Sequence, residues 1–538
     1  MLKPGKKNDL ITRLEVMNFR WNIMVFALAY SLITLVLYHK PLFSFAIANL
    51  DYHSLNGIII LAELVIMQVL SVFLLIMMMS FVRIIVKPIC IIFFLLNAVG
   101  FYFITQYNVI LDKTMMGNVF NTNLGEAGEL YNPKILLCIL LLGVLPSIVI
   151  ARVKISTISA LKRIIVMCVA ILVTIIFAYA NSKTWLWFDK NAKRVGGLSM
   201  PLSYVINSIR YSVSVSHNGT EIRLPDAHFT NNHQTIVVLV IGESARMANF
   251  SLYGYRRNTN PYLAKDNVVA MRDTTSCTTY TTESIKCMLS HLGSHSSRTL
   301  YESLPTYLQR NNVNVIWRSN NWGEPKMHVA QFEKANEIRE KCSGDSCKKL
   351  DNDGVLLYRL DQELKKHLND NAFIILHQTG SHGPQYSTKY PPQFETFKPV
   401  CKSVELQKCT HDELVNAYDN TIIYTDYFLH QVISSLESLK DVSSVMIYIS
   451  DHGESLGEYN FYLHGVPYSF APDVQKKIPF IIWTSDKFKK EHHLTNQNLA
   501  KQAHHSQDNV FHSIMGAFGA TSEFYKKDLD VFYNNDAK

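Results

Sequence analysis

Ionisable side chains are scarce in the first third of this 538-residue chain. Within its long apolar runs, Glu63 and Lys87 are the main ionisable residues. Membrane transporters usually have ionisable side chains along the path of the substrate. With so few in the apolar runs, no transport path is apparent. The chain also has no internal repeat and no low-complexity tract, which argues against a repeat architecture.

The cysteines lack the two-residue spacing that is usual in zinc–thiolate sites, which are the alternative to disulfides here. Three of the nine lie in apolar runs, where a free thiol is a small apolar side chain; these are Cys90, Cys138 and Cys168. The other six are close neighbours in sequence: Cys277 and Cys287, Cys342 and Cys347, Cys401 and Cys409. Pairing in sequence order would close three short loops, so we expect disulfides and an oxidising compartment.

Long apolar runs are abundant before about residue 180, whereas the sequence after about residue 220 is typical of a soluble protein. Five runs are long enough to cross a bilayer, which takes roughly 20 apolar residues. They are Trp21–Tyr38, Ile58–Met79, Ile85–Ile104, Ile135–Ile150 and Ile164–Ala180. The first is too long for a cleaved signal peptide, and no small-residue cleavage site follows it at once. We therefore expect it to be an anchor.

Lysine and arginine concentrate in alternate loops, which predicts the orientation of the spans. The basic segments contain Lys3, Lys6, Lys7, Arg13, Arg20, Arg83, Lys87, Arg152, Lys154, Lys162 and Arg163, whereas loops 39–57 and 105–133 have far fewer. Basic loops stay in the cytoplasm, so we expect a cytoplasmic N-terminal tail and, after five spans, an external second half. The net charge of +8 partly reflects this bias, and we do not expect a nucleic-acid partner.

Three regions follow from this pattern: a transmembrane domain over 1–180, a bridging segment over 181–220, and a globular domain over 221–538. In the bridge, Lys183–Phe188 is rich in tryptophan and is typical of an interfacial anchor. The stretch Pro201–Val215 has apolar residues at helical intervals. It is compatible with a helix lying along the membrane and equally with an ordinary linker helix.

From residue 234, apolar β-rich runs alternate with helical patterns, which predicts an α/β domain with a mostly parallel sheet. The expected strands are Thr235–Ile241, Val313–Trp317, Ala372–His377, Ser444–Ile449 and Ile478–Trp483. The expected helices are Leu304–Arg310, Val355–His367, Asp412–Leu439 and Ala500–Phe518. Each strand is almost entirely apolar, as strands buried on both faces are.

Polar side chains follow four of these strands, at the edge where open α/β sheets bind ligands. Glu243 follows the first, Asn321 the second, His382 the third, and Asp451 with His452 the fourth. Alone, an Asp–His pair is usually a capped turn, and a lone glutamate is usually an acid at a helix N-terminus. Agreement among four strand ends instead favours a metal site. Oxygen and nitrogen ligands suit Zn²⁺ or Mn²⁺, and the imidazoles favour zinc.

A hydroxyl-rich segment between Cys277 and Cys287 contains Thr281 and precedes a helical pattern. A threonine at a helix N-terminus can act as a nucleophile if a metal lowers its pKa, and the helix end would favour an incoming phosphate. The alternative interpretation is a simple N-cap. Composition alone leaves both readings open.

Four ordered motifs carry a resemblance to a known family. V-I-G-E-S-A-R around Glu243, the cysteine-flanked threonine segment, H-Q-T-G-S-H-G-P around His382 and S-D-H-G-E-S-L-G-E around Asp451 resemble the membrane phosphoethanolamine transferases. That family is of the lipid A and colistin-resistance type and belongs to the alkaline-phosphatase-like (sulfatase-like) superfamily. The resemblance covers nearly the whole chain, including the spans and the six paired cysteines.

The resemblance implies a role for each matching residue. Thr281 would be the nucleophile, and a zinc ion would be held by Glu243, Thr281, Asp451 and His452. His382 and His464, with Glu454 nearby, would contact the phosphate or a second, weaker zinc and protonate the leaving group. The residues that would contact substrate are Asn321, Lys326, Asn118 and Thr122, although Lys326 is displaced by about one position from the family lysine. His505, Asp508 and His512 are expected to be structural.

The implied reaction moves phosphoethanolamine from phosphatidylethanolamine to a lipid A phosphate or another envelope glycan. It would take place at the bacterial inner membrane, in a monomer whose catalytic domain is periplasmic. Added amines would lower the negative surface charge and so favour polymyxin resistance. The alternatives are a related phosphoglycerol transferase or sulfatase-like hydrolase, and a non-catalytic envelope assembly protein.

Overall fold

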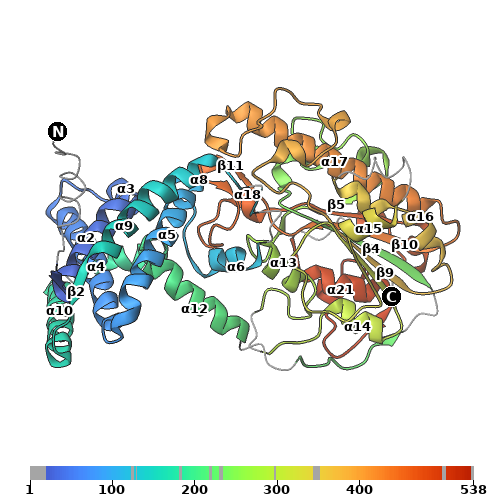
Figure 1. The fold of residues 1–538 in the computed structure, drawn as a ribbon. Coiled ribbons are helices and arrows are strands. Elements are labelled where there is room, and N and C mark those ends of the chain that lie inside the picture. The colour runs from blue at the N-terminus through green and yellow to red at the C-terminus, as the bar shows by residue number, and fades with distance from the viewer. Residues whose placement is uncertain are drawn as a thin grey trace, which may run out of the picture. The chain divides into compact units, whose positions relative to one another are not determined.

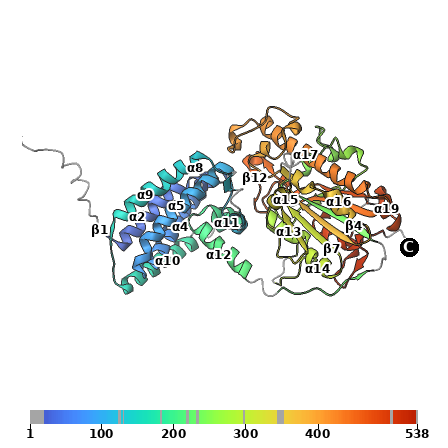
Figure 2. The same cartoon turned by 45° about the vertical axis from the view of Figure 1, so that its right-hand side comes forward.

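The computed structural model describes residues 20–122, 127–128, 130–180, 184–216, 221–229, 234–295, 299–342, 352–499 and 504–534. The chain forms two compact units, which are drawn as ribbons in Figure 1 and Figure 2. One unit comprises the chain up to Gly117 together with Tyr131–Tyr211, and the other comprises Asn118–Leu130 and the chain from Ser212 onward. The first is helical and the second is built around a sheet.

The helical unit contains the apolar runs. Its helices are α2 (Ile23–Tyr38), α3 (Lys40–Ala48), α4 (Leu55–Met79), α5 (Arg83–Tyr107), α6 (Lys113–Asn121), α8 (Pro133–Cys138), α9 (Leu145–Arg152), α10 (Ala160–Ala180), α11 (Trp185–Leu198) and α12 (Leu202–Ser216). Among the described residues, four helical stretches are long and apolar enough to cross a membrane. The count becomes five if α2 and α3, which are bent by 62°, form one span.

The fourth predicted run is a helix with an internal irregularity. A π-helical turn over Ile139–Val144 joins α8 to α9, just before Pro146. Proline has no backbone N–H and crowds the preceding helical turn, so a wider turn before it accommodates the ring without ending the helix. The first predicted run is shorter than expected, because Trp21 lies in strand β1 (Arg20–Asn22), which pairs with β2 (Lys154–Ser156).

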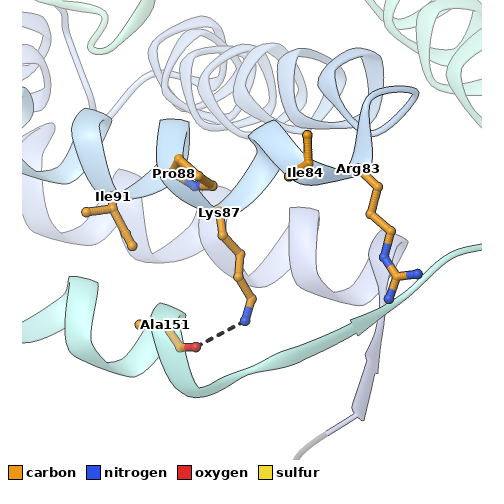
Figure 3. A pocket seen from close by; sticks show the side chains of 6 residues that line it. All are labelled: Arg83, Ile84, Lys87, Pro88, Ile91 and Ala151. Carbon is orange, nitrogen blue, oxygen red and sulfur yellow. Dashed lines mark hydrogen bonds between the residues drawn. The ribbon is translucent and has the colours of Figure 1, made fainter.

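Basic side chains fix the start of α5. Lys87 Nζ donates to the carbonyl of Ala151 near the end of α9 at 3.0 Å, and Arg83 Nη2 donates to the carbonyl of Ile155 at 3.0 Å. Figure 3 shows both side chains on the wall of a cavity at this end of the unit. Cations favour the carbonyl ends of helices, so these contacts hold α5 to the α9–β2 connection. Whether this end is cytoplasmic stays a prediction.

A seven-stranded sheet organises the second unit, in the order β5-β13-β10-β4-β9-β7-β8. The strands are β4 (Thr235–Gly242), β5 (Val269–Ala270), β7 (Asn314–Ser319), β8 (Gln331–Lys334), β9 (Ala372–His377), β10 (Ser443–Ser450) and β13 (Phe480–Thr484). Strands β10, β4, β9, β7 and β8 are parallel, and β13 is antiparallel to both β10 and β5. The predicted mostly parallel sheet is confirmed.

Strand register places the carboxyl ends level with one another. Gly242 of β4 pairs with Ser450 of β10, and His377 of β9 pairs with Ile241 and with Ser319 of β7. Successive side chains of a strand point to opposite faces. The side chains of β4 therefore enter two different hydrophobic cores, one on each face of the sheet. Each large apolar side chain that is fully buried there contributes about 1.5–3 kcal/mol to the stability of the folded state.

Helices cover both faces of the sheet (Figure 1). Helix α17 (His411–Glu437) packs on the face of Ile236, Val238 and Val240. On the face of Val237, Leu239 and Ile241 lie α13 (Thr281–Met288), α14 (Leu304–Arg310) and α21 (Asp508–Ala517). The remaining helices are α15 (Ala335–Lys341), α16 (Leu360–Lys365), α18 (Asp473–Lys476), α19 (Asp486–Glu491) and α20 (Asn496–Leu499).

Two of the predicted helices are wrong in extent. The helix expected over Val355–His367 is divided into a 3-10 segment, Asn352–Leu357, and α16. Arg359 between them has φ 52°, a left-handed conformation that no α-helix contains. Of the helix expected over Ala500–Phe518, residues 500–503 lie outside the described residues. The described part is helical only from Asp508, because strand β14 (His505–Ser506) pairs with β6 (Thr274–Thr275).

Short antiparallel pairs complete the unit, and they were not predicted. They are β11 (Ser455–Leu456) with β12 (Tyr462–Leu463), and β15 (Ala520–Thr521) with β3 (His228–Phe229).

Two of the three expected disulfides are confirmed, Cys277–Cys287 and Cys401–Cys409. Cys342 is also disulfide-bonded, and its expected partner, Cys347, lies outside the described residues. The cysteines of the apolar runs are free thiols, as predicted. Helix α12 coincides with the predicted helical stretch of the bridge.

We predict that stability falls as pH rises from about 4 to about 7, in part through Asp530. This residue is buried beside α21, where Tyr525 Oη donates to it at 2.5 Å and Phe532 N at 2.8 Å. Burial raises the pKa of Asp530 to about 7. The folded state therefore retains a proton that the unfolded state releases above pH 4, a loss of at most about 4 kcal/mol.

The measurement is the melting temperature of the purified protein in a chelating buffer at about pH 5 and about pH 8. Asp530→Asn should reduce the difference between the two values, because the amide does not ionise. A residual difference is expected, since burial also raises the pKa of Asp426 to about 7. Equal pH dependence in the two proteins would contradict the assignment.

Candidate metal and catalytic site

The ends of β4 and β10 are joined by hydrogen bonds from backbone amides. Asp451 N donates to the carbonyl of Gly242 at 2.9 Å, and Ser244 N donates to Asp451 Oδ1 at 3.0 Å. Ser244 has φ 54°, a left-handed conformation that is uncommon for a residue with a side chain. Such strained positions persist where the surrounding structure fixes them, often at functional sites. This turn directs the side chain of Glu243 toward that of Asp451.

Four side chains meet at this edge of the sheet. Thr281 Oγ1 donates to Glu243 Oε2 at 3.1 Å and lies 3.5 Å from His452 Nε2. His452 Nε2 lies 3.3 Å from Glu243 Oε1 and 3.2 Å from Asp451 Oδ2. All four residues are at most 2% exposed. The structure thus brings together the whole set of predicted zinc ligands.

The position of Thr281 is fixed by contacts on both sides of it. It is the first residue of α13, and the Cys277–Cys287 disulfide links the segment before the helix to its last turn. Gln507 Oε1 accepts a hydrogen bond from Cys277 N at 2.8 Å, and its Nε2 donates to the carbonyl of Asp451 at 2.6 Å. Gln507 therefore connects the threonine segment directly to the end of β10.

The cluster fits a divalent cation. Ligand atoms of Glu243, Asp451 and His452 all lie within 4.8 Å of one another. Asp451 Oδ2 is buried and has no hydrogen-bond partner among the described residues. Burial and the neighbouring Glu243 carboxylate both raise the pKa of Asp451, because two adjacent buried carboxylates resist joint ionisation. A bound cation would remove that repulsion, and carboxylate with imidazole is a donor set typical of zinc or manganese.

A second cluster adjoins the first. Glu454 Oε2 contacts His464 Nδ1 at 2.9 Å, and Glu454 Oε1 accepts a hydrogen bond from Tyr386 Oη at 2.7 Å. The ring of His464 lies 4.3 Å from that of His452 and 5.2 Å from that of His382, centre to centre. Ligand atoms of His452, Glu454 and His464 form another group able to hold a metal ion.

The buried imidazoles of this region are neutral at neutral pH. Burial lowers the pKa of His382 to about 3, although the Glu243 carboxylate opposes this shift. Burial and the neighbouring His464 lower the pKa of His452 to about 3 as well. A neutral imidazole is the form that binds a metal ion.

Of the residues predicted to contact substrate, Asn321 lies in the candidate metal-binding cluster and Lys326 lies in a separate cavity. Asn321 Nδ2 donates to Glu243 Oε2 at 2.9 Å and to the carbonyl of Gln378 at 2.8 Å, so Asn321 belongs to the cluster. Lys326 is exposed and lines a separate cavity with Met327 and Phe332. Its contact with a head group stays a prediction.

Asn118 and Thr122 lie at the end of α6. The Thr122 hydroxyl donates to the carbonyl of Asn118 at 2.8 Å. This hydrogen bond satisfies a carbonyl in the last turn of the helix, and the expected contact of the two residues with a lipid stays a prediction.

Sequence reasoning missed residues that support the site. Asp353 accepts hydrogen bonds from the amides of Thr379 and Gly380 at 2.8 and 2.9 Å and from Asn320 Nδ2 at 2.9 Å. It thereby holds together the loops that follow β7 and β9. Its only signal in the sequence was an acid in a predicted connection. Gln507 gave no signal, because it lay within the helix predicted over Ala500–Phe518.

Comparison with known protein families shows to which family the chain belongs. A family described as Sulfatase matches residues 235–520, and one described as Phosphoethanolamine transferase EptA/EptB matches residues 69–215. Phosphoethanolamine transferase EptA of Helicobacter pylori is 42% identical over 515 residues, which cover 94% of this chain and 95% of the relative. The chain belongs to the EptA family of phosphoethanolamine transferases.

Two further relatives of the EptA family extend the comparison. Phosphatidylethanolamine transferase Mcr-1 of Escherichia coli is 34% identical over 435 residues, covering 76% of this chain and 80% of the relative. The solved structure of the integral membrane lipooligosaccharide phosphoethanolamine transferase A from Neisseria meningitidis is 29% identical. It superposes with a TM-score of 0.84 over 95% of this chain and 97% of that one. Membrane helices followed by a sulfatase-like α/β domain are therefore the architecture of this enzyme.

We predict that Asp451→Asn removes most of the zinc-induced stabilisation. A ligand at 100 times its Kd stabilises the folded state by about 2.7 kcal/mol, and the variant loses one charged ligand. Without metal, the variant should melt at a higher temperature than the wild type, because a hydrogen-bonding amide replaces a repelling carboxylate. The measurement is thermal melting with chelator and with added zinc.

The matched control is Asp473→Asn, which removes an exposed carboxylate from α18. Its zinc-induced shift should equal that of the wild type. A full zinc-induced shift in Asp451→Asn would mean that the ion binds elsewhere.

Proposed function

We propose that the chain is a zinc-dependent enzyme that transfers phosphoethanolamine from phosphatidylethanolamine to a lipid A phosphate through a covalent Thr281 intermediate. The observation that carries the proposal is the Thr281 hydroxyl, buried within 3.1 Å of Glu243 Oε2 and 3.5 Å of His452 Nε2. The names of two relatives support the donor and acceptor: one is a phosphatidylethanolamine transferase and the other a lipooligosaccharide phosphoethanolamine transferase.

Glu243, Thr281, Asp451 and His452 would hold the zinc ion. When bound, zinc would neutralise charge on the phosphoryl group and lower the pKa of the threonine hydroxyl. The hydroxyl oxygen of Thr281 would then attack phosphorus, and the bond from phosphorus to the glycerol oxygen would break. The proton lost by Thr281 would replace the one that His382 or His464 gives to the leaving glycerol oxygen. The N-terminus of α13 favours a phosphate next to its first residue.

The leaving diacylglycerol oxygen takes up a proton, and His382 and His464 are the proposed donors. Burial keeps His382 neutral in the resting protein, whereas an anionic phosphate beside it would favour its protonated form. The Glu454 carboxylate orients the ring of His464 through Nδ1. A second, weaker zinc near His382 and His464 is part of the proposal. His464 belongs, with His452 and Glu454, to a group of side chains able to hold a metal ion.

A phosphate oxygen of the acceptor would then attack the phosphorus on Thr281 and restore the free hydroxyl. The product lipid carries an additional amine, so its net negative charge is lower. Weaker attraction of cationic peptides, and with it polymyxin resistance, would follow. Another envelope glycan would serve as acceptor by the same chemistry.

We place the enzyme in the bacterial inner membrane with five spans, of which α2 and α3 together form the first. The N-terminal tail would be cytoplasmic and the domain from 221 to 538 periplasmic, with 181–220 as the bridge between it and the spans of 1–180. Disulfides in the second unit support an oxidising compartment. Anchoring a monomer in the membrane would raise the effective concentration of both lipids.

We predict that Thr281→Ala abolishes transfer while the protein remains folded. The variant loses the oxygen that bonds to phosphorus, whereas Thr281→Ser keeps it and should retain measurable activity. The matched control is Thr282→Ala, the next residue of α13, which should retain most activity. The measurements are transfer from labelled phosphatidylethanolamine and mass spectrometry of the Thr281 peptide. Transfer by a folded Thr281→Ala protein would eliminate the proposed nucleophile.

The family assignment favours phosphoethanolamine transfer over the alternative, a phosphoglycerol transferase or sulfatase-like hydrolase. We predict that the wild-type protein produces labelled acceptor from phosphatidylethanolamine and none from phosphatidylglycerol. Thin-layer chromatography of parallel reactions measures both products. Product from phosphatidylglycerol alone, or release of a sulfate or phosphate without an acceptor, would favour the alternative.

A further inference from the structure

The helical unit contains a cavity of its own, formed without any residue of the catalytic cluster. It has a volume of about 420 Å³ and is formed by α4, α10 and α11. Its walls include Glu63, Met67, Thr174, Phe177, Phe188 and Asp189. Among the described residues that line it, none is basic. The lining therefore combines two carboxyl groups with a mostly apolar surface.

Glu63 is the unusual member of this lining. It lies within a helix that is long and apolar enough to span a membrane, and it is only 5% exposed. Thr184 hydrogen-bonds to its carboxyl group, but Oε2 has no partner among the described residues. An uncompensated acid at such a position is costly and is usually retained for function. A cationic ligand in the cavity would provide the missing partner.

The rest of the cavity suits an amphiphile with a positively charged head. Asp189 is exposed at the start of α11 and supplies a second negative charge. The rings of Phe177 and Phe188 can contact a cation through their faces, and Met67 and Ile66 offer apolar surface for an acyl chain. Small inorganic cations need several oxygen ligands and gain nothing from such walls.

The location favours a lipid over a soluble amine. Glu63 is in the third turn of α4, Phe177 in the last turn of α10 and Asp189 in the second turn of α11. All three therefore lie toward the end of the helical unit from which the chain continues to the sheet-containing unit. By the span assignment proposed above, that end faces the outer leaflet.

We propose that this cavity binds a phospholipid with a primary ammonium head group. Three N–H donors allow such a head to hydrogen-bond with Glu63 Oε2 and to pair with Asp189. A quaternary ammonium has no N–H donor, and a glycerol head has no positive charge. This proposal rests on the proposed function. It adds that the donor lipid is held in the helical unit before it reaches Thr281.

The test is native mass spectrometry of the full-length protein in detergent, in a Thr281→Ala background so that bound lipid is not consumed. Phosphatidylethanolamine, phosphatidylcholine and phosphatidylglycerol with identical acyl chains are titrated separately. We expect phosphatidylethanolamine to bind most tightly. Glu63→Gln should weaken its binding about tenfold, the factor for one hydrogen bond between charged groups, with little effect on the other two lipids.

Two further variants keep the test decisive. Asp51→Asn removes an exposed carboxylate before α4 and should leave all three affinities unchanged. Ala192→Trp narrows the cavity from the exposed side of α11 while both carboxylates remain, so it should weaken phosphatidylethanolamine binding even if Glu63→Gln fails to fold.

Equal affinities of the unsubstituted cavity for the three lipids, or equal losses for all three in Glu63→Gln, would overturn the inference. Failure of the proposed function has a different signature: selective phosphatidylethanolamine binding would persist, but the protein with Thr281 intact would form no transfer product.

Discussion

Two buried carboxylates, those of Glu243 and Asp451, constrain the rest of the catalytic unit. Both are fully buried, and each lies within 3.3 Å of the same nitrogen of His452. Moving such charges out of water costs several kcal/mol per ion unless an opposite charge compensates. The register of β4 and β10 and the left-handed Ser244 hold them together. The fold thus holds two carboxylates close together although their negative charges repel each other. A bound cation would stabilise this arrangement.

The surrounding structure supports this arrangement from several directions. Gln507 links the threonine segment to β10, Asp353 joins the loops after β7 and β9, and Asn321 donates to the oxygen of Glu243 that also contacts Thr281. Because rigid groups around a reacting atom lower the cost of reaching the transition state, these contacts are as relevant to the proposed transfer as the ligands themselves.

The parts of the fold and of the site that depend on neighbouring residues in the sequence could be predicted. Continuous apolar runs identified β4 and β9, and polar residues directly after strands identified Glu243 and Asp451. Edge strand β8, with the sequence Q-F-E-K, has no comparable apolar pattern. Gln507 could not be identified because its partners Cys277 and Asp451 are 230 and 56 residues away. Tertiary pairing also overrode the helical pattern before Asp508, where β14 forms instead.

The most direct measurement of the central claim is anomalous diffraction at the zinc edge from crystals of the zinc-loaded, full-length protein. We expect one strong peak at about 2.0–2.2 Å from oxygen or nitrogen atoms of Glu243, Asp451 and His452, with Thr281 Oγ1 facing the same ion. A zinc peak found only elsewhere in the protein, with no peak among Glu243, Asp451 and His452, would contradict the proposed zinc site.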